Sequence, residues 1–314
     1  MLNSADKKAL LLALIDTLDP EQAVDEAETE QKALELIQTH RELLGMHSEA
    51  DQNITPLIAS VMSPDRCASL PLFKQLLQKP TDVNAVQDAN ITVTHFLTLY
   101  NRHKHLQALL AEHLETLDVN VQTAAGATPI YYAALKGASE STALLTQLTK
   151  ADVNIPNKNE QTPLHVACFF GQSAGGKQII PISPELAQNY IDTIQLLLLA
   201  GAEVDAKDKW GSTPAHCLVA ADIPPEMKAT ALNLLIEHGA NLELKANNES
   251  SVSTIANAYD YQSFRPMLQQ QKVPPLKILA AKKVLETESE KSHSIFEDIA
   301  DILKKLTLGK SKPK

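Results

Sequence analysis

The chain has 314 residues, of which 44% are hydrophobic and 4% aromatic, and its formal net charge is −10. This composition excludes a fibrous or largely disordered chain, and the acidic charge disfavours nucleic acid as a partner, because like charges repel. Three cysteines are too few for a disulfide framework and indicate a reducing compartment, and no apolar run is long enough to span a membrane.

Residues 1–50 predict a helical N-terminal cap. Leucines recur at helical spacing between residues 10 and 18, and a second helical pattern covers residues 21–44. The segment Ala9–Ile15 is apolar, but Asp6 and Asp16 flank it and it spans only seven residues. A secretory signal peptide is therefore disfavoured.

A short pattern recurs through the middle of the chain. Thr-Pro pairs begin at Thr55, Thr128, Thr162 and Thr213, each ahead of a leucine-rich stretch. An acidic or polar turn follows each stretch, at Asp82–Asn84, Asp118–Asn120, Asp152–Asn154, Glu203–Asp205 and Asn241–Glu243. The turns recur every 34 to 36 residues, except for a spacing of 51 between Asn154 and Asp205. A fixed period of this length indicates a repeat architecture.

These segments resemble the ankyrin repeat. The similarity is carried by Gln161–Gly171 (QTPLHVACFFG), Leu196–Asp205 (LLLLAGAEVD), Trp210–Cys217 (WGSTPAHC) and Leu234–Leu242 (LLIEHGANL). It implies an all-α solenoid of helix–turn–helix repeats with short hairpin turns over residues 51–245. The units are 51–87, 88–122, 123–157, 158–207 and 208–245, followed by a degenerate capping repeat at 246–272. Residues 172–188 are an insertion between the two helices of one unit.

The search for catalytic, cofactor and metal motifs finds none that the repeat does not explain. His165 and Cys168, and the adjacent pair His216 and Cys217, contain zinc-ligand atoms, but they occupy ordinary repeat positions without a second ligand pair. We expect both histidines to bond to the backbone of neighbouring repeats. The basic cluster at residues 102–105 is interpreted as a solvated turn. The sequence therefore predicts a protein without enzymatic activity, cofactor or metal.

What remains is recognition of a protein partner. Mapping onto the ankyrin pattern exposes aromatic and basic residues on three adjacent units, and aromatic side chains anchor protein interfaces. The predicted partner-binding residues are Tyr132, Lys136, Val166, Phe169 and Phe170 on first helices, and Lys209 and Trp210 at a hairpin tip. The alternative for Phe169 and Phe170 is that they pack under the inserted loop.

Residues 273–314 form a tail of different character. From Lys272 onward there are ten lysines and six acidic residues, and we expect one amphipathic helix at about 294–307. Repeats followed by a glutamate cluster, here Glu286–Glu290, resemble the effectors that intracellular bacteria secrete through type IV systems. That resemblance implies a monomer that binds a host protein in the host cytoplasm. The alternatives are a resident cytosolic adaptor and, more remotely, an enzyme.

Overall fold

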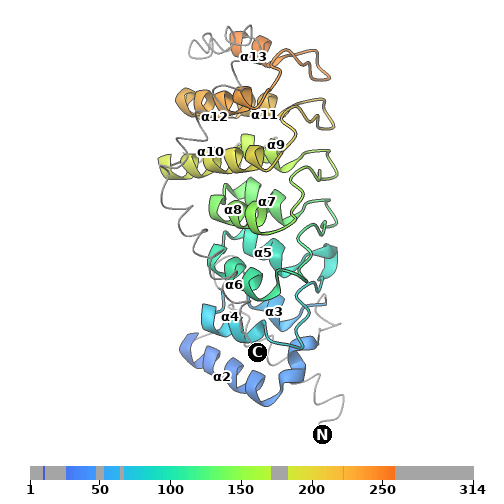
Figure 1. Cartoon of the computed structure of the whole chain (residues 1–314), viewed down its shortest axis with the longest axis vertical. Helices are drawn as coiled ribbons and strands as arrows, with labels where there is room; N and C mark the ends of the chain where they lie inside the picture. Colours follow the sequence, from blue (N-terminus) through green and yellow to red (C-terminus); the bar gives the residue numbers. More distant parts are fainter. Residues whose placement is uncertain are drawn as a thin grey trace, which may run out of the picture.

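The computed structural model describes residues 10, 26–46, 53–63, 67–170, 183–221 and 223–258. Here the helices stack along one axis, and the hairpins that connect successive units project from one side of the stack (Figure 1). First helices contact first helices and second helices contact second helices, so the stack has two layers. The first-helix layer contains α3 (Pro56–Ala59), α5 (Val93–Leu99), α7 (Pro129–Lys136), α9 (Pro163–Cys168), α11 (Pro214–Ala220) and α13 (Val252–Ala258). The second-helix layer contains α4 (Leu70–Leu76), α6 (His103–His113), α8 (Ser139–Leu148), α10 (Pro184–Leu199) and α12 (Pro225–Glu237).

The prediction of an all-α repeat solenoid is confirmed. In the described part of the chain, β-structure is limited to isolated bridge residues, such as the pairs Gln87–Ile91 and Lys245–Ser251. The short 3-10 helix η2 (Asp88–Asn90) lies between Gln87 and Ile91. One continuous core of leucines and other apolar side chains runs from Ala33 to Val252. Leu145 and Leu197, on two adjacent second helices, are completely buried in it.

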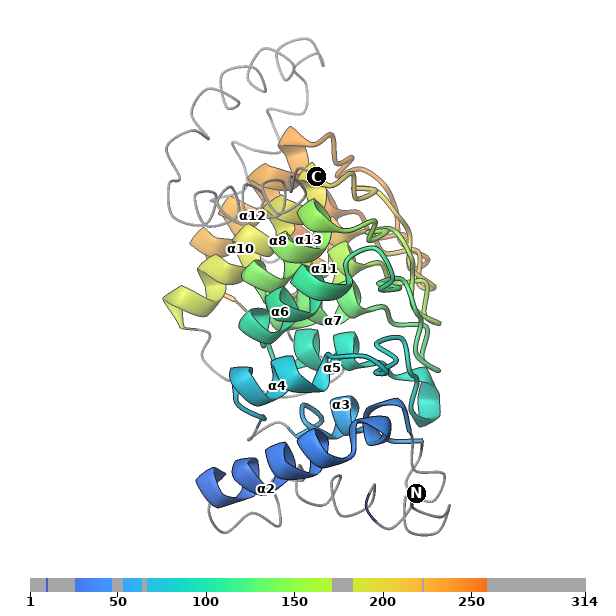
Figure 2. The ribbon, with the colours of Figure 1, turned by 60° about the horizontal axis from the view of Figure 1, so that its bottom comes forward.

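The N-terminal end of the stack is covered by α2 (Glu26–Thr39) and the 3-10 helix η1 (Arg41–Gly45), as Figure 2 shows. α2 packs on α4, and the Glu30 carboxylate accepts hydrogen bonds from the Ser69 amide and hydroxyl, both at 2.7 Å. The helix expected at 21–44 is therefore present from Glu26, with a break at His40. Of the helix expected around residues 10–18, only Leu10 is described, and it is helical.

Helix starts follow from the threonines of the repeat. The Thr128 hydroxyl accepts the Tyr131 amide at 3.3 Å, and Pro129 takes the first helical position, where no amide donor is needed. In three other units the third helical residue is a histidine that bonds back to the threonine. His95, His165 and His216 accept the amides of Thr92, Thr162 and Thr213 at their Nδ1 atoms.

The same histidines connect successive units. Their Nε2 atoms donate to the carbonyls of Ala127, Ser212 and Ser250, at 3.2, 3.0 and 3.2 Å. Because Nδ1 accepts and Nε2 donates, each ring is neutral and held in one tautomer. The prediction that His165 and His216 are structural is confirmed, and His95 plays the same part.

Asparagine side chains make a second connection between units. The Asn84, Asn120 and Asn154 side chains each accept the amide of the next turn, from Asp118, Asp152 and Glu203 at 2.8 to 2.9 Å. Each also donates its amide group to a carbonyl of that turn, namely Thr116, Lys150 and Gly201. At the next position Asp205 accepts the Asn241 amide but has no hydrogen to donate.

Two expectations need correction. α10 begins at Pro184, because the Ser183 hydroxyl caps it by accepting the Leu186 amide, so residues 184–188 of the insertion are helical rather than a projecting loop. The cluster at residues 102–105 is not simply solvated: Arg102 donates to the carbonyls of Val61 and Ser63, at 2.9 and 2.6 Å. His105 donates to the Ala68 carbonyl at 2.9 Å. Residues 171–182 and 259–314, which contain most of the insertion and the whole tail, lie outside the described residues.

Candidate protein-binding surface

The hairpin tips form a continuous ridge. Each tip turns through a residue with positive φ two positions before the helix-capping residue, at Asn53, Asn90, Gly126, Glu160, Gly211 and Glu249. From the tip at Gly126 onward, one backbone bond joins each tip to the one before it. The bonds run from Ala124 to Ala89, Lys158 to Ala125, Lys209 to Asn159 and Asn247 to Trp210, at 2.6 to 3.0 Å. We call residues 88–90, 124–126, 158–160, 209–211 and 247–249 the tip ridge.

Trp210 stands out on this ridge. It is the only tryptophan of the chain, and 48% of its surface is exposed. Its backbone is fixed on both sides: its amide donates to the Asp208 carboxylate at 3.0 Å, and its carbonyl accepts the Asn247 amide at 2.9 Å. Lys209 beside it is exposed. The tip therefore presents a large aromatic side chain to solvent from a rigid base, which is the geometry of an interface anchor.

The helical part of the predicted surface is less exposed than the tip. Tyr132 on α7 is half-buried, with its ring edge-on to His95 at 5.8 Å between centroids. Lys136 is exposed at the end of α7, and Phe169 is half-buried just after α9. The structure thus places these three residues on neighbouring units of the first-helix layer.

Val166 and Phe170 are buried, with 4% and 2% of their surfaces exposed. The Phe170 ring packs against Tyr190 of α10, with 5.1 Å between centroids, and the Tyr190 hydroxyl donates to the Leu135 carbonyl. This corrects the expectation that Val166 and Phe170 are exposed, because both side chains belong to the buried core. The alternative that Phe169 and Phe170 pack under the inserted loop concerns residues 171–182, which lie outside the described residues.

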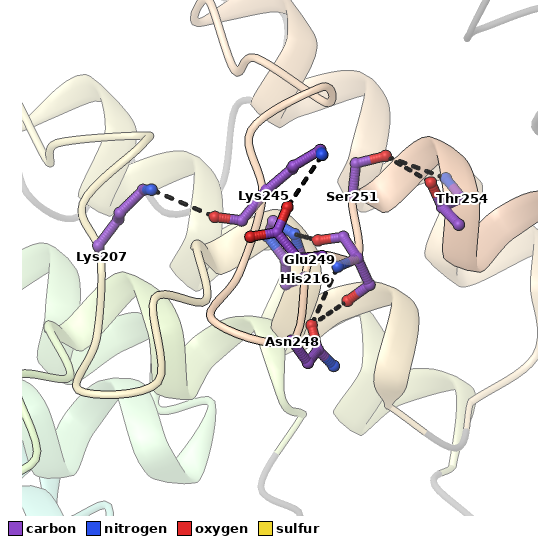
Figure 3. Close-up of polar contacts among 8 residues, drawn as sticks. Lys207, His216, Lys245, Asn248, Glu249, Ser251 and Thr254 are labelled. Atoms are coloured by element: carbon purple, nitrogen blue, oxygen red, sulfur yellow. Dashed lines mark hydrogen bonds and ion pairs between the residues drawn. The ribbon is translucent and has the colours of Figure 1, made fainter.

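Three basic residues near the ridge were missed by sequence reasoning. Lys158 is at the tip before Trp210, while Lys207 and Lys245 directly precede the last two tips. Figure 3 shows Lys207 donating to the Lys245 carbonyl at 3.2 Å and Lys245 paired with Glu249 at 3.0 Å. The signal was available in the sequence, because Lys207 and Lys245 fall at matching positions of consecutive units, as do Lys158 and Lys209.

Cys67 and His105 are a thiol and an imidazole in contact, which is the combination of a nucleophile and a general base. The Cys67 sulfur lies 3.5 Å from the His105 Nε2 atom. Burial raises the pKa of the Cys67 thiol and lowers that of His105, and Nε2 already donates to the Ala68 carbonyl. A thiol kept protonated next to a donating nitrogen is a poor nucleophile. The arrangement is that of packing rather than catalysis.

Metal and membrane sites were also sought. Within the described ranges, no group of three His, Cys, Asp or Glu side chains is placed to hold a metal ion. Cys168 and Cys217 are buried, which raises the pKa of both thiols. No helix among the described residues is long and apolar enough to cross a bilayer.

Comparisons with known proteins agree with this architecture. The family profile "Ankyrin repeats (3 copies)" matches residues 104–181, and the profile "Ankyrin repeat" matches residues 159–209. Rabankyrin-5 from Mus musculus is 28% identical over 137 residues, which are 40% of this chain and 10% of that protein. The chain thus spans about a tenth of the length of this curated relative.

Two solved structures share the fold. The ankyrin-repeat protein EF0377 superposes with a TM-score of 0.55 and 20% identity, over 68% of this chain and 96% of that one. The ankyrin-repeat domain of Bcl-3, a member of the IkappaB family, superposes with a TM-score of 0.54 and 20% identity, over 78% and 92%. At this identity the likeness shows the fold alone.

Proposed function

Because the chain carries ankyrin repeats, we propose that it is a non-catalytic module that binds a protein partner. The observation that carries the proposal is the exposed Trp210 on its hydrogen-bonded tip. The proposed contact surface consists of Tyr132, Lys136, Phe169, Lys209 and Trp210. It combines an aromatic anchor with half-buried aromatic side chains and exposed lysines, which is the composition of interface hot spots and their rims.

Affinity capture from lysate, followed by affinity measurement with the protein captured, tests this proposal. Trp210→Ala should weaken binding by about 2 kcal/mol, or roughly 30-fold, if the indole is an anchor. The fold should survive, because the tip bonds of residue 210 use backbone atoms. Leu199→Ala is the matched control, since Leu199 is a large apolar side chain, 62% exposed, on the second-helix layer.

Two results would separate the possibilities. If Trp210→Ala and Tyr132→Ala both leave the affinity unchanged, the binding surface is not the tip and first-helix face. If Leu199→Ala weakens binding instead, the partner contacts the second-helix layer.

We further propose that the partner is a host protein reached by translocation from a bacterium, and that the chain acts as a monomer. The support is in the sequence of the tail: the glutamate cluster Glu286–Glu290 within a basic, lysine-rich end. A reporter fused to residues 272–314 should be delivered into host cells, and deletion of residues 286–314 should abolish delivery of the full chain. A reporter that stays in the producing cell would favour a resident adaptor.

A further inference from the structure

The charge of the side chains on the tip ridge changes from one end to the other. The tips of the 88–122 and 123–157 units carry Asp88 and two alanines, Ala124 and Ala125. From Lys158 onward the exposed charges at or directly before the tips are mainly basic: Lys158, Lys207, Lys209 and Lys245, against Glu160 and Glu249. This local excess of lysine stands in a chain whose net charge is −10.

The acidic groups of this region are partly neutralised by their own contacts. The Asp208 carboxylate is buried and accepts the amides of Trp210 and Ser212, at 3.0 and 2.8 Å. Glu249 pairs with Lys245 at 3.0 Å. Lys158 and Lys209, by contrast, are exposed, and the bond from the Lys209 amide to the Asn159 carbonyl joins their two tips. The exposed Trp210 therefore lies on a ridge that also carries exposed lysines.

We propose that the last three tips, those of residues 158–160, 209–211 and 247–249, bind an extended acidic segment of the partner that carries an aromatic side chain. The aromatic ring packs on Trp210, and carboxylates pair with Lys158, Lys207 and Lys209. Charge complementarity of this kind sets specificity and speeds association. The inference rests on the proposed function and names the chemistry of its ligand.

The spacing of the tips defines the register of such a segment. Neighbouring helices pack about 8–10 Å apart, so successive tips are separated by a similar distance. An extended chain advances about 3.3 Å per residue, so one tip corresponds to about three residues. Carboxylates at every third position can therefore meet successive tips.

Single-stranded nucleic acid is the competing ligand, because it also combines negative charge with rings that stack on tryptophan. The net charge of −10 opposes it, since a nucleic acid carries a charge at every nucleotide and approaches the whole acidic molecule. A short peptide segment samples only the local field of the ridge. We therefore assign the surface to an acidic peptide.

Fluorescence of the full chain provides the test, because its sole tryptophan is the residue at issue. The probe is a synthetic ten-residue peptide with glutamate at every third position and one central phenylalanine. The reference probes are the same peptide with glutamine for glutamate, and oligo(dT) of equal length. We expect the acidic peptide to change Trp210 emission and to bind about tenfold more tightly than the glutamine peptide at low salt, with the advantage lost as ionic strength rises.

Variants assign the effect to the ridge. Combining Lys158→Gln, Lys207→Gln and Lys209→Gln should remove the preference for the acidic peptide. The matched control combines Lys74→Gln, Lys104→Gln and Lys150→Gln, which changes the net charge equally at exposed sites of the second-helix side. This control should retain the preference.

Three outcomes overturn the inference: equal binding of the acidic and glutamine peptides, equal loss of preference in both triple variants, or tighter binding of oligo(dT). The proposed function is judged separately with the captured partner. If Trp210→Ala weakens that partner but the ridge triple variant does not, the protein-binding function stands and the acidic ligand is refuted. If neither variant weakens it, the acidic ligand is refuted and the partner contacts a surface other than the tip ridge.

Discussion

The 51–87 and 208–245 units build the same pair of helices by different means. The 208–245 unit relies on its own motif: Thr213 and His216 close the start of the first helix, and Gly211 supplies the positive φ of the tip. A side chain at Gly211 would be strained by the positive φ, and its Cβ would lie 2.5 Å from the Asn247 Oδ1 atom and 3.0 Å from the Asn247 amide nitrogen. The residues that stabilise its turns are therefore residues of the repeat motif, and this is why its sequence resembles the ankyrin pattern.

The 51–87 unit has no glycine, and Ile58 replaces the motif histidine. Its inter-helix loop is held instead by side chains from both neighbours. Arg102 bonds the carbonyls of Val61 and Ser63 from one side, and Glu30 bonds Ser69 from the other. Contacts between units can therefore replace contacts within a unit, and a divergent sequence retains the fold.

The largest effect should be the same in both units, because they share one core. Leu76→Ala and Leu235→Ala should each lower the free energy of unfolding by about 2–5 kcal/mol, since both side chains are fully buried and leave a cavity. Urea denaturation followed by circular dichroism measures this. A loss below about half a kilocalorie per mole at Leu76 alone would show that the core does not extend into the divergent unit.

The motif histidines should make the regular units sensitive to acid. Burial lowers the pKa of His95 to about 4, and burial also lowers the pKa of His165 and His216. The unfolded state therefore takes up these protons first, so stability is complete above pH 6.5 and is lost as pH falls toward 4. For His95 the loss approaches about 3 kcal/mol at most.

Chemical denaturation at several pH values, comparing the wild type with His95→Gln, isolates this contribution. The variant is less stable at neutral pH but should lose less stability on acidification. The 51–87 unit should contribute no such pH dependence, because Ile58, which cannot titrate, takes the place of the motif histidine. Parallel pH profiles for wild type and variant would contradict the assignment.

The divergent unit should depend on its neighbour. Arg102→Met keeps the aliphatic packing but removes the two hydrogen bonds to the 61–63 backbone, and should cost about 1–3 kcal/mol. Arg41→Met is the control, because among the described contacts Arg41 makes only one exposed hydrogen bond, to the Gln78 side chain, and its loss should cost little. Differential scanning calorimetry compares the two, and equal melting temperatures would remove the role given to Arg102.

The smallest expected effect is an increase in stability. Asp205→Asn restores the donor that Asn84, Asn120 and Asn154 each supply to the next turn, and should stabilise the chain by about 0.5–1.5 kcal/mol. The reciprocal change Asn120→Asp removes a donor and should destabilise by a similar amount. Thermal melts of the two variants should move in opposite directions, and shifts of the same sign would refute the ladder interpretation.

The sequence predicted the fold well because its signals are local. Within four residues, the motif of Thr162, Pro163 and His165 determines both where the helix starts and which side chain bonds the next unit. The site was predicted only in part. Phe170 looked exposed on a generic repeat, but its burial depends on Tyr190, which the insertion places out of the usual register. Arg102 was misjudged for the same physical reason, because its partners Val61 and Ser63 are some forty positions away.

The asparagine and histidine connections affect how the number of repeat units can change in evolution. Each uses one side chain to reach the backbone of whichever unit comes next, without regard to its sequence. A deletion of residues 121–154 in a single genetic event would place Asn120 opposite the Glu203 amide, the group that Asn154 now bonds. His95 would then face the carbonyl of Gln161 instead of that of Ala127. Gain or loss of whole units is therefore open to this lineage, and so is an insertion within a unit, since Asn154 still bonds the Glu203 amide across the longer spacing.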